Sequence, residues 1–141
     1  MKDYIEIERI WQSDYYFQVK ITCISESITV TNKIYTSNEC IDELFSNLED
    51  FLDGKVKECL WLNGEKGDGS TACVSFEFSH KDKLGHILVE VYIEIDDGGN
   101  YSNHNCCFYV NTEIGLLSDF KNDLWRIKEP RLGEKIALNH F

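Results

Sequence analysis

The stretch HILVEVYIEID, residues 86–96, decides the class of fold. Its odd-numbered positions all carry β-branched residues, namely Ile87, Val89, Val91, Ile93 and Ile95. Its even-numbered positions are mixed in character: His86, Leu88, Glu90, Tyr92, Glu94 and Asp96. Because successive side chains of a β-strand point to opposite sides, this alternation predicts a strand over Gly85–Asp96 with one buried and one largely polar side.

Similar alternation recurs on both sides of this strand. It predicts further strands at Tyr4–Trp11, Tyr15–Cys23, Ser27–Tyr35, Lys55–Leu62, Thr71–His80 and His104–Thr112. The loops at residues 63–70 and 97–100 are rich in Asn, Asp and Gly, which favour tight turns. We therefore expect most neighbouring strands to run antiparallel.

Two segments have helical spacing instead. Thr36 and Glu39 have the spacing of a capping box, which predicts the start of a helix, and Gly54 predicts its end. The apolar residues between them recur every three or four positions: Ile41, Leu44, Phe45, Leu48 and Leu52. A second helix is predicted over Glu113–Lys128, before Pro130. The last eleven residues are predicted to form a tail.

Strands interrupted by only two helices indicate an α+β fold. We expect a mostly antiparallel sheet of about six to seven strands with the two helices packed on one face. A length of 141 residues fits one domain over residues 1–141. Hydrophobic residues make up 43% of the chain, which is typical of a globular protein.

The charge of the chain restricts its partners. Acidic residues outnumber basic ones by 25 to 14, so the formal net charge is −11 and nucleic acid is not expected as a partner. No apolar run approaches the roughly 18 residues of a membrane-spanning helix, and residues 1–16 lack the apolar core of a secretory signal. The six cysteines lie in apolar segments rather than in loops, so we expect reduced thiols and a cytoplasmic location.

The sequence predicts no catalytic or metal site. His104, Cys106 and Cys107 are ligand types for zinc, but adjacent cysteines in a strand point to opposite sides. Glu90 and Glu94 lie roughly 13 Å apart along one strand, farther than the carboxylates of a glycosidase. No Ser or Cys has the local context of a known nucleophile. We therefore expect no cofactor and a protein that is not an enzyme.

The placement of the acids is the remaining functional signal. Residues 38–53 and 86–97 hold ten of the 25 acids and no Lys or Arg. A solvated surface is the commoner explanation of such charge runs. The alternative is a surface that captures a basic protein, with Leu88, Tyr92 and Trp61 as anchors. The candidate binding residues are Glu39, Asp42, Glu43, Asp50, Asp53, Glu90, Tyr92, Glu94, Asp96 and Asp97.

From Ile28 to Arg126 the chain resembles a known family. The similarity rests on three segments: the helix Leu44-Phe45-x-x-Leu48-x-x-Phe51-Leu52 ending at Gly54, the strand Gly85–Val91, and Cys107–Val110 running into Leu116-Leu117-x-x-Phe120. These segments are similar to those of WapI-type immunity proteins of bacterial polymorphic, contact-dependent toxin systems. Such proteins are cytosolic, bind toxins non-covalently and have no catalytic residues.

The resemblance implies a role for the chain. It implies an immunity protein that neutralises a cognate toxin C-terminal domain, a basic nuclease, by steric and electrostatic occlusion. The alternative is a small-molecule-binding or enzymatic α+β domain with a pocket lined by His and Cys.

Overall fold

The computed structural model describes residues 3–67, 72–95 and 104–139, which contain eight strands and two helices. The elements follow one another as β1 (Tyr4–Gln12), β2 (Phe17–Ser25), β3 (Ile28–Thr36), α1 (Asn38–Leu52), β4 (Glu58–Asn63), β5 (Val74–His80), β6 (His86–Glu94), β7 (Asn105–Glu113), α2 (Ile114–Lys128) and β8 (Lys135–Asn139). None of the helices in these ranges is long and apolar enough to cross a membrane.

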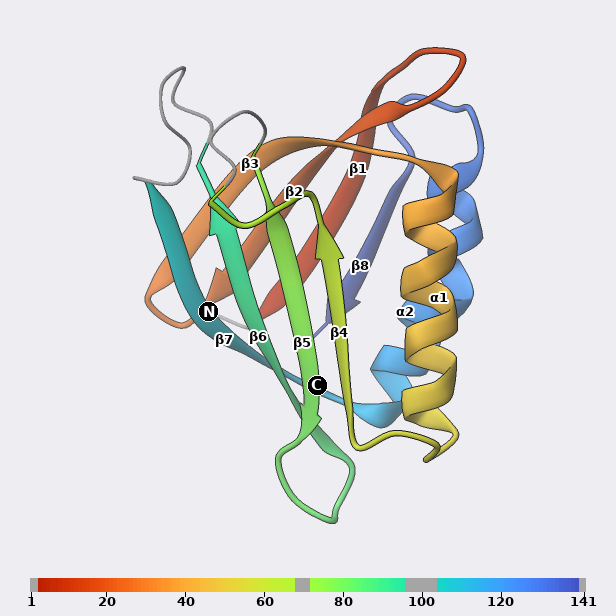
Figure 1. Ribbon diagram of the computed structural model, residues 1–141. Coiled ribbons are helices and arrows are strands. Elements are labelled where there is room, and N and C mark those ends of the chain that lie inside the picture. The colour runs from red at the N-terminus through yellow and green to blue at the C-terminus, as the bar shows by residue number, and fades with distance from the viewer. Residues whose placement is uncertain (1–2, 68–71, 96–103, 140–141) are drawn as a thin grey trace.

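The strands form two antiparallel sheets of four strands each. The first sheet has the order β3-β2-β1-β8 and the second has the order β4-β5-β6-β7. In Figure 1 the second sheet lies in front of the first. The α+β class and the antiparallel pairing are confirmed, but the single sheet of six to seven strands is wrong. Alternation shows which side of a strand is buried, but it does not show whether helices or a second sheet pack against that side.

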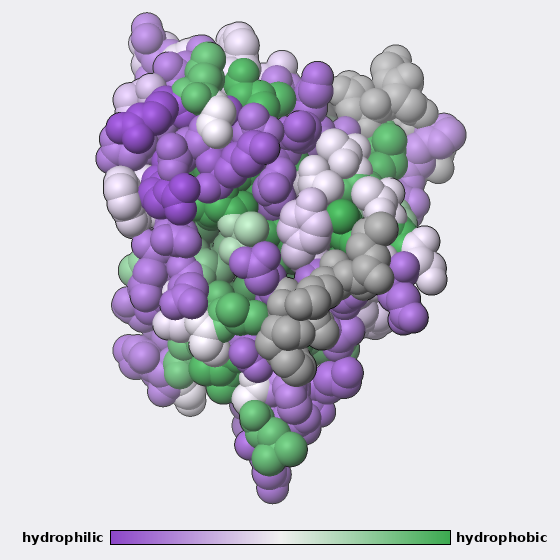
Figure 2. All heavy atoms as spheres, turned by 180° about the vertical axis from the view of Figure 1, so that it is seen from behind, coloured by the Kyte–Doolittle hydropathy of each residue, from purple (hydrophilic) through white to green (hydrophobic). Residues whose placement is uncertain are grey.

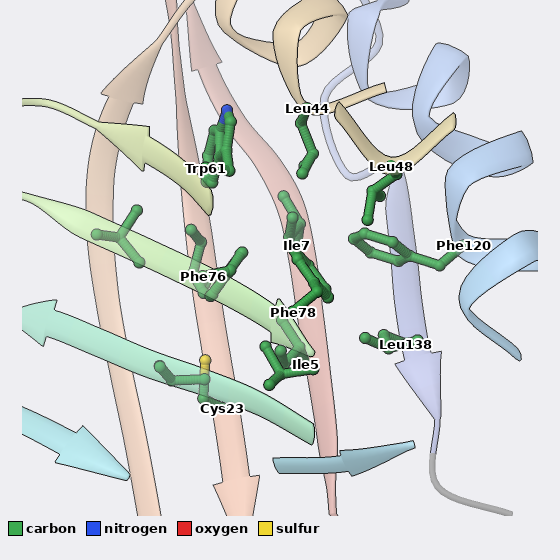
Figure 3. Close-up of a cluster of buried hydrophobic side chains, with 14 of the residues drawn as sticks. Ile5, Ile7, Cys23, Leu44, Leu48, Trp61, Phe76, Phe78, Phe120 and Leu138 are labelled. Atoms are coloured by element: carbon green, nitrogen blue, oxygen red, sulfur yellow. The ribbon is translucent and has the colours of Figure 1, made fainter. Parts of the chain in front are cut away.

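One hydrophobic core joins both sheets and both helices. Figure 3 shows Ile7 of β1 and Phe78 of β5 facing Leu48 of α1 and Phe120 of α2. The helices stand beside the edge strands β4 and β8, where they close the core between the sheets (Figure 1). The prediction that they cover one face of a single sheet is therefore wrong. In α1 the predicted Ile41, Leu44 and Leu48 are buried, but Phe45 is exposed and Phe51, which was not part of the predicted stripe, is buried instead. The buried residues of α2 are Leu117, Phe120, Leu124 and Ile127.

Polar side chains connect the two sheets. Thr36 at the end of β3 donates to Asn63 Oδ1 at the end of β4 at 2.8 Å, and the Asn63 amide donates to the Tyr35 carbonyl at 2.9 Å. The Asp3 carboxylate accepts from the backbone and side-chain amides of Asn111 in β7 at 2.9 and 3.0 Å. Hydrogen bonds between buried partners have strict geometry, so these contacts fix the relative position of the sheets.

Two local predictions need correction. The N-cap of α1 is Ser37, whose hydroxyl accepts from the Cys40 N–H at 3.3 Å, whereas Thr36 bonds across to Asn63. The predicted tail contains β8, which pairs with β1. The alternation over Lys135–Asn139 is a strand signal that the tail prediction overlooked, but its partner lies more than 100 residues earlier in the chain and the local sequence does not indicate that pairing.

Arg9 joins β1 to α2 inside the molecule. Arg9 points inward in alternation with the buried Ile5 and Ile7. The β1 register shifts between Arg9 and Trp11, so Trp11 reaches the outer side of the sheet. The Arg9 guanidinium lies 3.8 Å from the Phe17 ring centre and donates to the Ile127 carbonyl at 2.8 Å. A cation at the C-terminal end of a helix interacts favourably with the helix dipole, so Arg9 stabilises the end of α2.

Candidate functional site

The outer side of the second sheet carries the most distinctive surface of the molecule. We call it the β4–β7 face and define it by six outward side chains: Leu60, Leu62, Glu77, Glu90, Cys107 and Tyr109. Leu60, Leu62 and Tyr109 are large apolar or aromatic residues with 54, 43 and 50% of their surface exposed. Figure 2 shows the opposite side of the molecule, where hydrophilic residues predominate and hydrophobic patches are scattered among them. The β4–β7 face therefore combines exposed apolar surface with acidic groups.

A single row of side chains crosses this face from edge to edge. Leu60 lies opposite Glu77, Glu77 opposite Glu90, and Glu90 opposite Tyr109. Two carboxylates are thus direct neighbours on the central strands β5 and β6. Like charges in this arrangement repel each other and destabilise the sheet.

The turn between β5 and β6 sets this register. The Lys81 N–H donates to the His86 carbonyl at 2.9 Å, and the Asp82 carboxylate accepts from the Leu84 N–H at 2.7 Å. Gly85 has a φ of 91°, which a residue with a Cβ rarely adopts. The hydrogen bond from His86 lowers the pKa of Asp82. The hairpin therefore holds Glu77 opposite Glu90.

Glu90 has contacts on one side only. Its carboxylate accepts from the Tyr109 hydroxyl at 3.4 Å and from the Cys107 thiol at 3.6 Å. The charge of Glu90 is the main cause of the raised pKa of Tyr109, and burial followed by this charge raises the pKa of Cys107. Glu77 has no hydrogen bond or ion pair to any residue that the structure describes. The negative charge of the pair is therefore not neutralised within the described part of the chain.

The acidic side of α1 adjoins the β4–β7 face. Asn47 of α1 donates to the Leu60 carbonyl of β4 at 3.2 Å. A hollow of about 170 Å³ lies between the two elements and is lined by Asn47, Asp50, Val56, Glu58, Cys59 and Leu60. Glu43 and Asp50 share the side of the helix with Asn47, because residues three or four apart lie on one side. The structure thus brings together two acidic segments that are far apart in the sequence.

The predicted acids of α1 are all exposed, but only two of them form ion pairs within the described residues. Asp42 forms an ion pair of 2.6 Å with Lys128 of α2, and Asp50 forms one of 3.8 Å with Lys55. Glu39, Glu43 and Asp53 have no ion pair within the described ranges. The sequence did not indicate the Asp42 pair, because Lys128 belongs to another helix.

Glu94 and Tyr92 do not belong to a surface, so their assignment as binding residues is wrong. Glu94 is fully buried and accepts from the N–H groups of Gly67 and Cys73 at 2.9 and 3.1 Å and from the Tyr92 hydroxyl at 2.8 Å. The Lys66 ammonium lies 4.1 Å from the Tyr92 ring centre. The loop after β4 therefore covers the outward side of β6 here, which alternation cannot predict.

Three further predictions have different outcomes. Trp61 is buried and donates to the Cys40 carbonyl at 2.9 Å, so it is no surface anchor. Leu88 is half-buried on the outward side of β6. Asp96 and Asp97 lie outside the described residues.

Sequence reasoning missed five members of the β4–β7 face: Leu60, Leu62, Glu77, Cys107 and Tyr109. The alternation in β4, β5 and β7 would have placed each of them outward. Their presence in one patch depends on strand order and register, which the sequence did not reveal.

An aromatic cluster on the first sheet was also missed. The rings of Trp11, Tyr16 and Tyr35 lie 5.5–6.1 Å apart, and Tyr15 beside them is 89% exposed. Tyr15 lies before β2 rather than inside it, contrary to the predicted strand. Ring pairs at these distances stabilise each other, so the cluster joins β1, β3 and the turn between β1 and β2.

The cysteines are only partly core residues. Cys23, Cys59 and Cys73 are buried as predicted, and burial raises the pKa of Cys23 to about 12 and those of Cys59 and Cys73 to about 11. Cys107 is exposed, contrary to the prediction of core thiols. Within the described residues, no group of three or more His, Cys, Asp or Glu side chains has the arrangement of a metal site.

Comparisons of the chain with protein-family models, with curated proteins and with solved structures found no match.

Proposed function

We propose that this protein is a cytoplasmic immunity protein that binds the basic C-terminal domain of a polymorphic toxin and blocks it by steric and electrostatic occlusion. The observation that carries the proposal is the β4–β7 face together with the adjoining acidic side of α1. Exposed apolar side chains lie there among carboxylates, and three of these, Glu43, Glu77 and Glu90, have no ion pair within the described residues. Protein interfaces commonly combine an apolar centre with a polar rim, and acidic groups complement a basic partner.

The net charge of the chain supports fast capture of such a partner. A formal charge of −11 attracts a basic domain over several ångströms and raises the rate of association, an effect that salt screens. Leu60, Leu62 and Tyr109 supply the surface that loses water on contact. Charge then controls association, whereas these buried contacts control dissociation.

The experiment is co-purification with the C-terminal domain of a toxin encoded beside this gene, followed by kinetic measurements at low and moderate salt. We expect a complex whose association slows as salt rises. Glu43→Lys combined with Asp50→Lys should slow association at least fivefold. The matched control is Asp119→Lys with Asp123→Lys, which changes the charge of α2 by the same amount. Failure of the wild-type protein to bind, or equal effects of both double variants, contradicts the proposal.

The pocket alternative has less support. Hollows of about 170, 270 and 300 Å³ are open to the surface, and no histidine lines any of them. Their one cysteine, Cys59, is a buried thiol whose pKa is raised to about 11, so it is a poor nucleophile at neutral pH. None of these three hollows is the His- and Cys-lined pocket that the alternative requires.

A further inference from the structure

Building on the proposed function, we propose that the β4–β7 face binds an arginine side chain of the basic partner. Its guanidinium lies between the carboxylates of Glu77 and Glu90, and Leu60 and Tyr109 pack against the residues on either side of it. The site is the row of four side chains that crosses strands β4 to β7.

The geometry of the row favours arginine over lysine. Directly opposed residues of an antiparallel pair have Cβ atoms about 5 Å apart, so Glu77 and Glu90 present two carboxylates side by side. A guanidinium is planar and has five N–H donors in a fixed fork, which can bond to both carboxylates together. An ammonium is a compact charge with no such fork. Tyr109 adds an aromatic ring, and arginine stacks on such rings.

The charge balance of the face also favours a cation from outside. Two lysines of the chain approach this side, but each has another contact. Lys66 lies over the Tyr92 ring, and Lys81 donates to Asn111 Oδ1 at 3.0 Å. The repulsion between Glu77 and Glu90 therefore persists in the free protein, and an inserted guanidinium would remove it.

The apolar ends of the row distinguish this face from a merely solvated charge cluster. Leu60 and Tyr109 are half exposed on the two edge strands, with the carboxylates between them. A partner that covers them excludes water from the carboxylates, which strengthens the charged hydrogen bonds. The expected occupant is thus an arginine with apolar neighbours on a basic protein surface.

Glu6 offers a matched control. It is half-buried on the outward side of β1, a central strand of the first sheet, as Glu77 is on β5 of the second. Its cross-strand neighbours are the uncharged Thr22 and Ala137. Glu77→Gln and Glu6→Gln therefore make the same chemical change, but only the first removes a like-charge contact.

The first test needs no partner. Glu77→Gln should raise the melting temperature of the free protein by at least 1 °C more than Glu6→Gln does. An equal or smaller rise would show that Glu77 and Glu90 do not repel each other in the free protein, and would overturn the proposal.

The second test uses N-acetyl-arginine amide and N-acetyl-lysine amide as probes, titrated while amide chemical shifts are recorded. The arginine probe should shift the signals of Glu77, Glu90 and Tyr109 and slow alkylation of Cys107. Glu77→Gln should reduce these effects at least threefold, whereas Glu6→Gln should retain them. Equal response to both probes, shifts spread over the acidic surface, or no shifts at all would overturn the proposal.

The third test separates this inference from the proposed function. With the toxin domain, Glu77→Gln should weaken binding at least tenfold and Glu6→Gln less than threefold. If the toxin domain binds and both variants bind equally, the arginine site is refuted and the immunity function stands. If the arginine probe binds as expected and no toxin domain does, the proposed function fails and the site stands.

Discussion

Replacing Glu94 should destabilise the protein without changing its interface. The carboxylate is fully buried and accepts from two backbone N–H groups and one hydroxyl. Glu94→Ala removes this acceptor. The N–H groups of Gly67 and Cys73 and the Tyr92 hydroxyl then lose their hydrogen-bond partner at a buried position. Hydrogen bonds to a charged group contribute about 1.5–3 kcal/mol each, but they are not additive within one network.

The expected loss follows from these contacts. A buried donor left without an acceptor costs about 1–3 kcal/mol, so three such donors, whose costs are not additive, give a loss of about 3–5 kcal/mol, which is a large part of the 5–15 kcal/mol stability typical of a domain. For a chain of this size the melting temperature should fall by about 10 °C. Glu94→Gln keeps the shape but places an amide N–H₂ toward one of the donors, so it should cost about half as much. Tyr92→Phe removes a single hydrogen bond and should cost the least.

Urea unfolding measures these losses, and amide hydrogen exchange localises them. The amides of Gly67 and Cys73 should lose protection in Glu94→Ala, whereas amides of α2 should change only as much as global stability does. If Glu94→Ala unfolds within about 1 kcal/mol of the wild-type protein, or if both amides stay protected, the network does not anchor the loop as the structure indicates.

Two other predictions concern single groups. Ser37→Ala should lower the free energy of unfolding by about 1 kcal/mol in urea titrations, because the α1 N-cap is lost; no change would mean that the Cys40 N–H finds another acceptor. Glu90→Gln should shift the pH profile of Cys107 alkylation to lower pH, because Glu90 helps to keep that thiol protonated. An unchanged profile would contradict the contact between these residues.

Local rules predicted most elements of this fold. The alternation in β6 and the spacing of apolar residues in α1 identified both elements almost to their ends. Long-range features were not predictable in this way. β8 depends on a partner at the other end of the chain, and the division into two sheets depends on which strands pair.

The candidate site was likewise predictable where it depends on local alternation and not where it depends on long-range pairing. The period of two correctly placed Glu90 outward, but it also placed Glu94 outward, where the loop after β4 covers it. Trp11 occupies the outer side only because the register of β1 shifts after Arg9. Glu77 belongs to the candidate site because the hairpin places it opposite Glu90. The local sequence around either residue does not indicate this pairing.

The most direct test of the central claim is the affinity of the toxin C-terminal domain for two matched charge reversals, Glu77→Lys and Glu6→Lys. Both change the net charge by the same amount on the outward side of a central strand, so general electrostatic attraction affects them alike. We predict that Glu77→Lys weakens binding by at least a hundredfold, whereas Glu6→Lys weakens it by less than fivefold. Equal losses in the two variants, with both proteins folded by their melting curves, would contradict binding through the β4–β7 face.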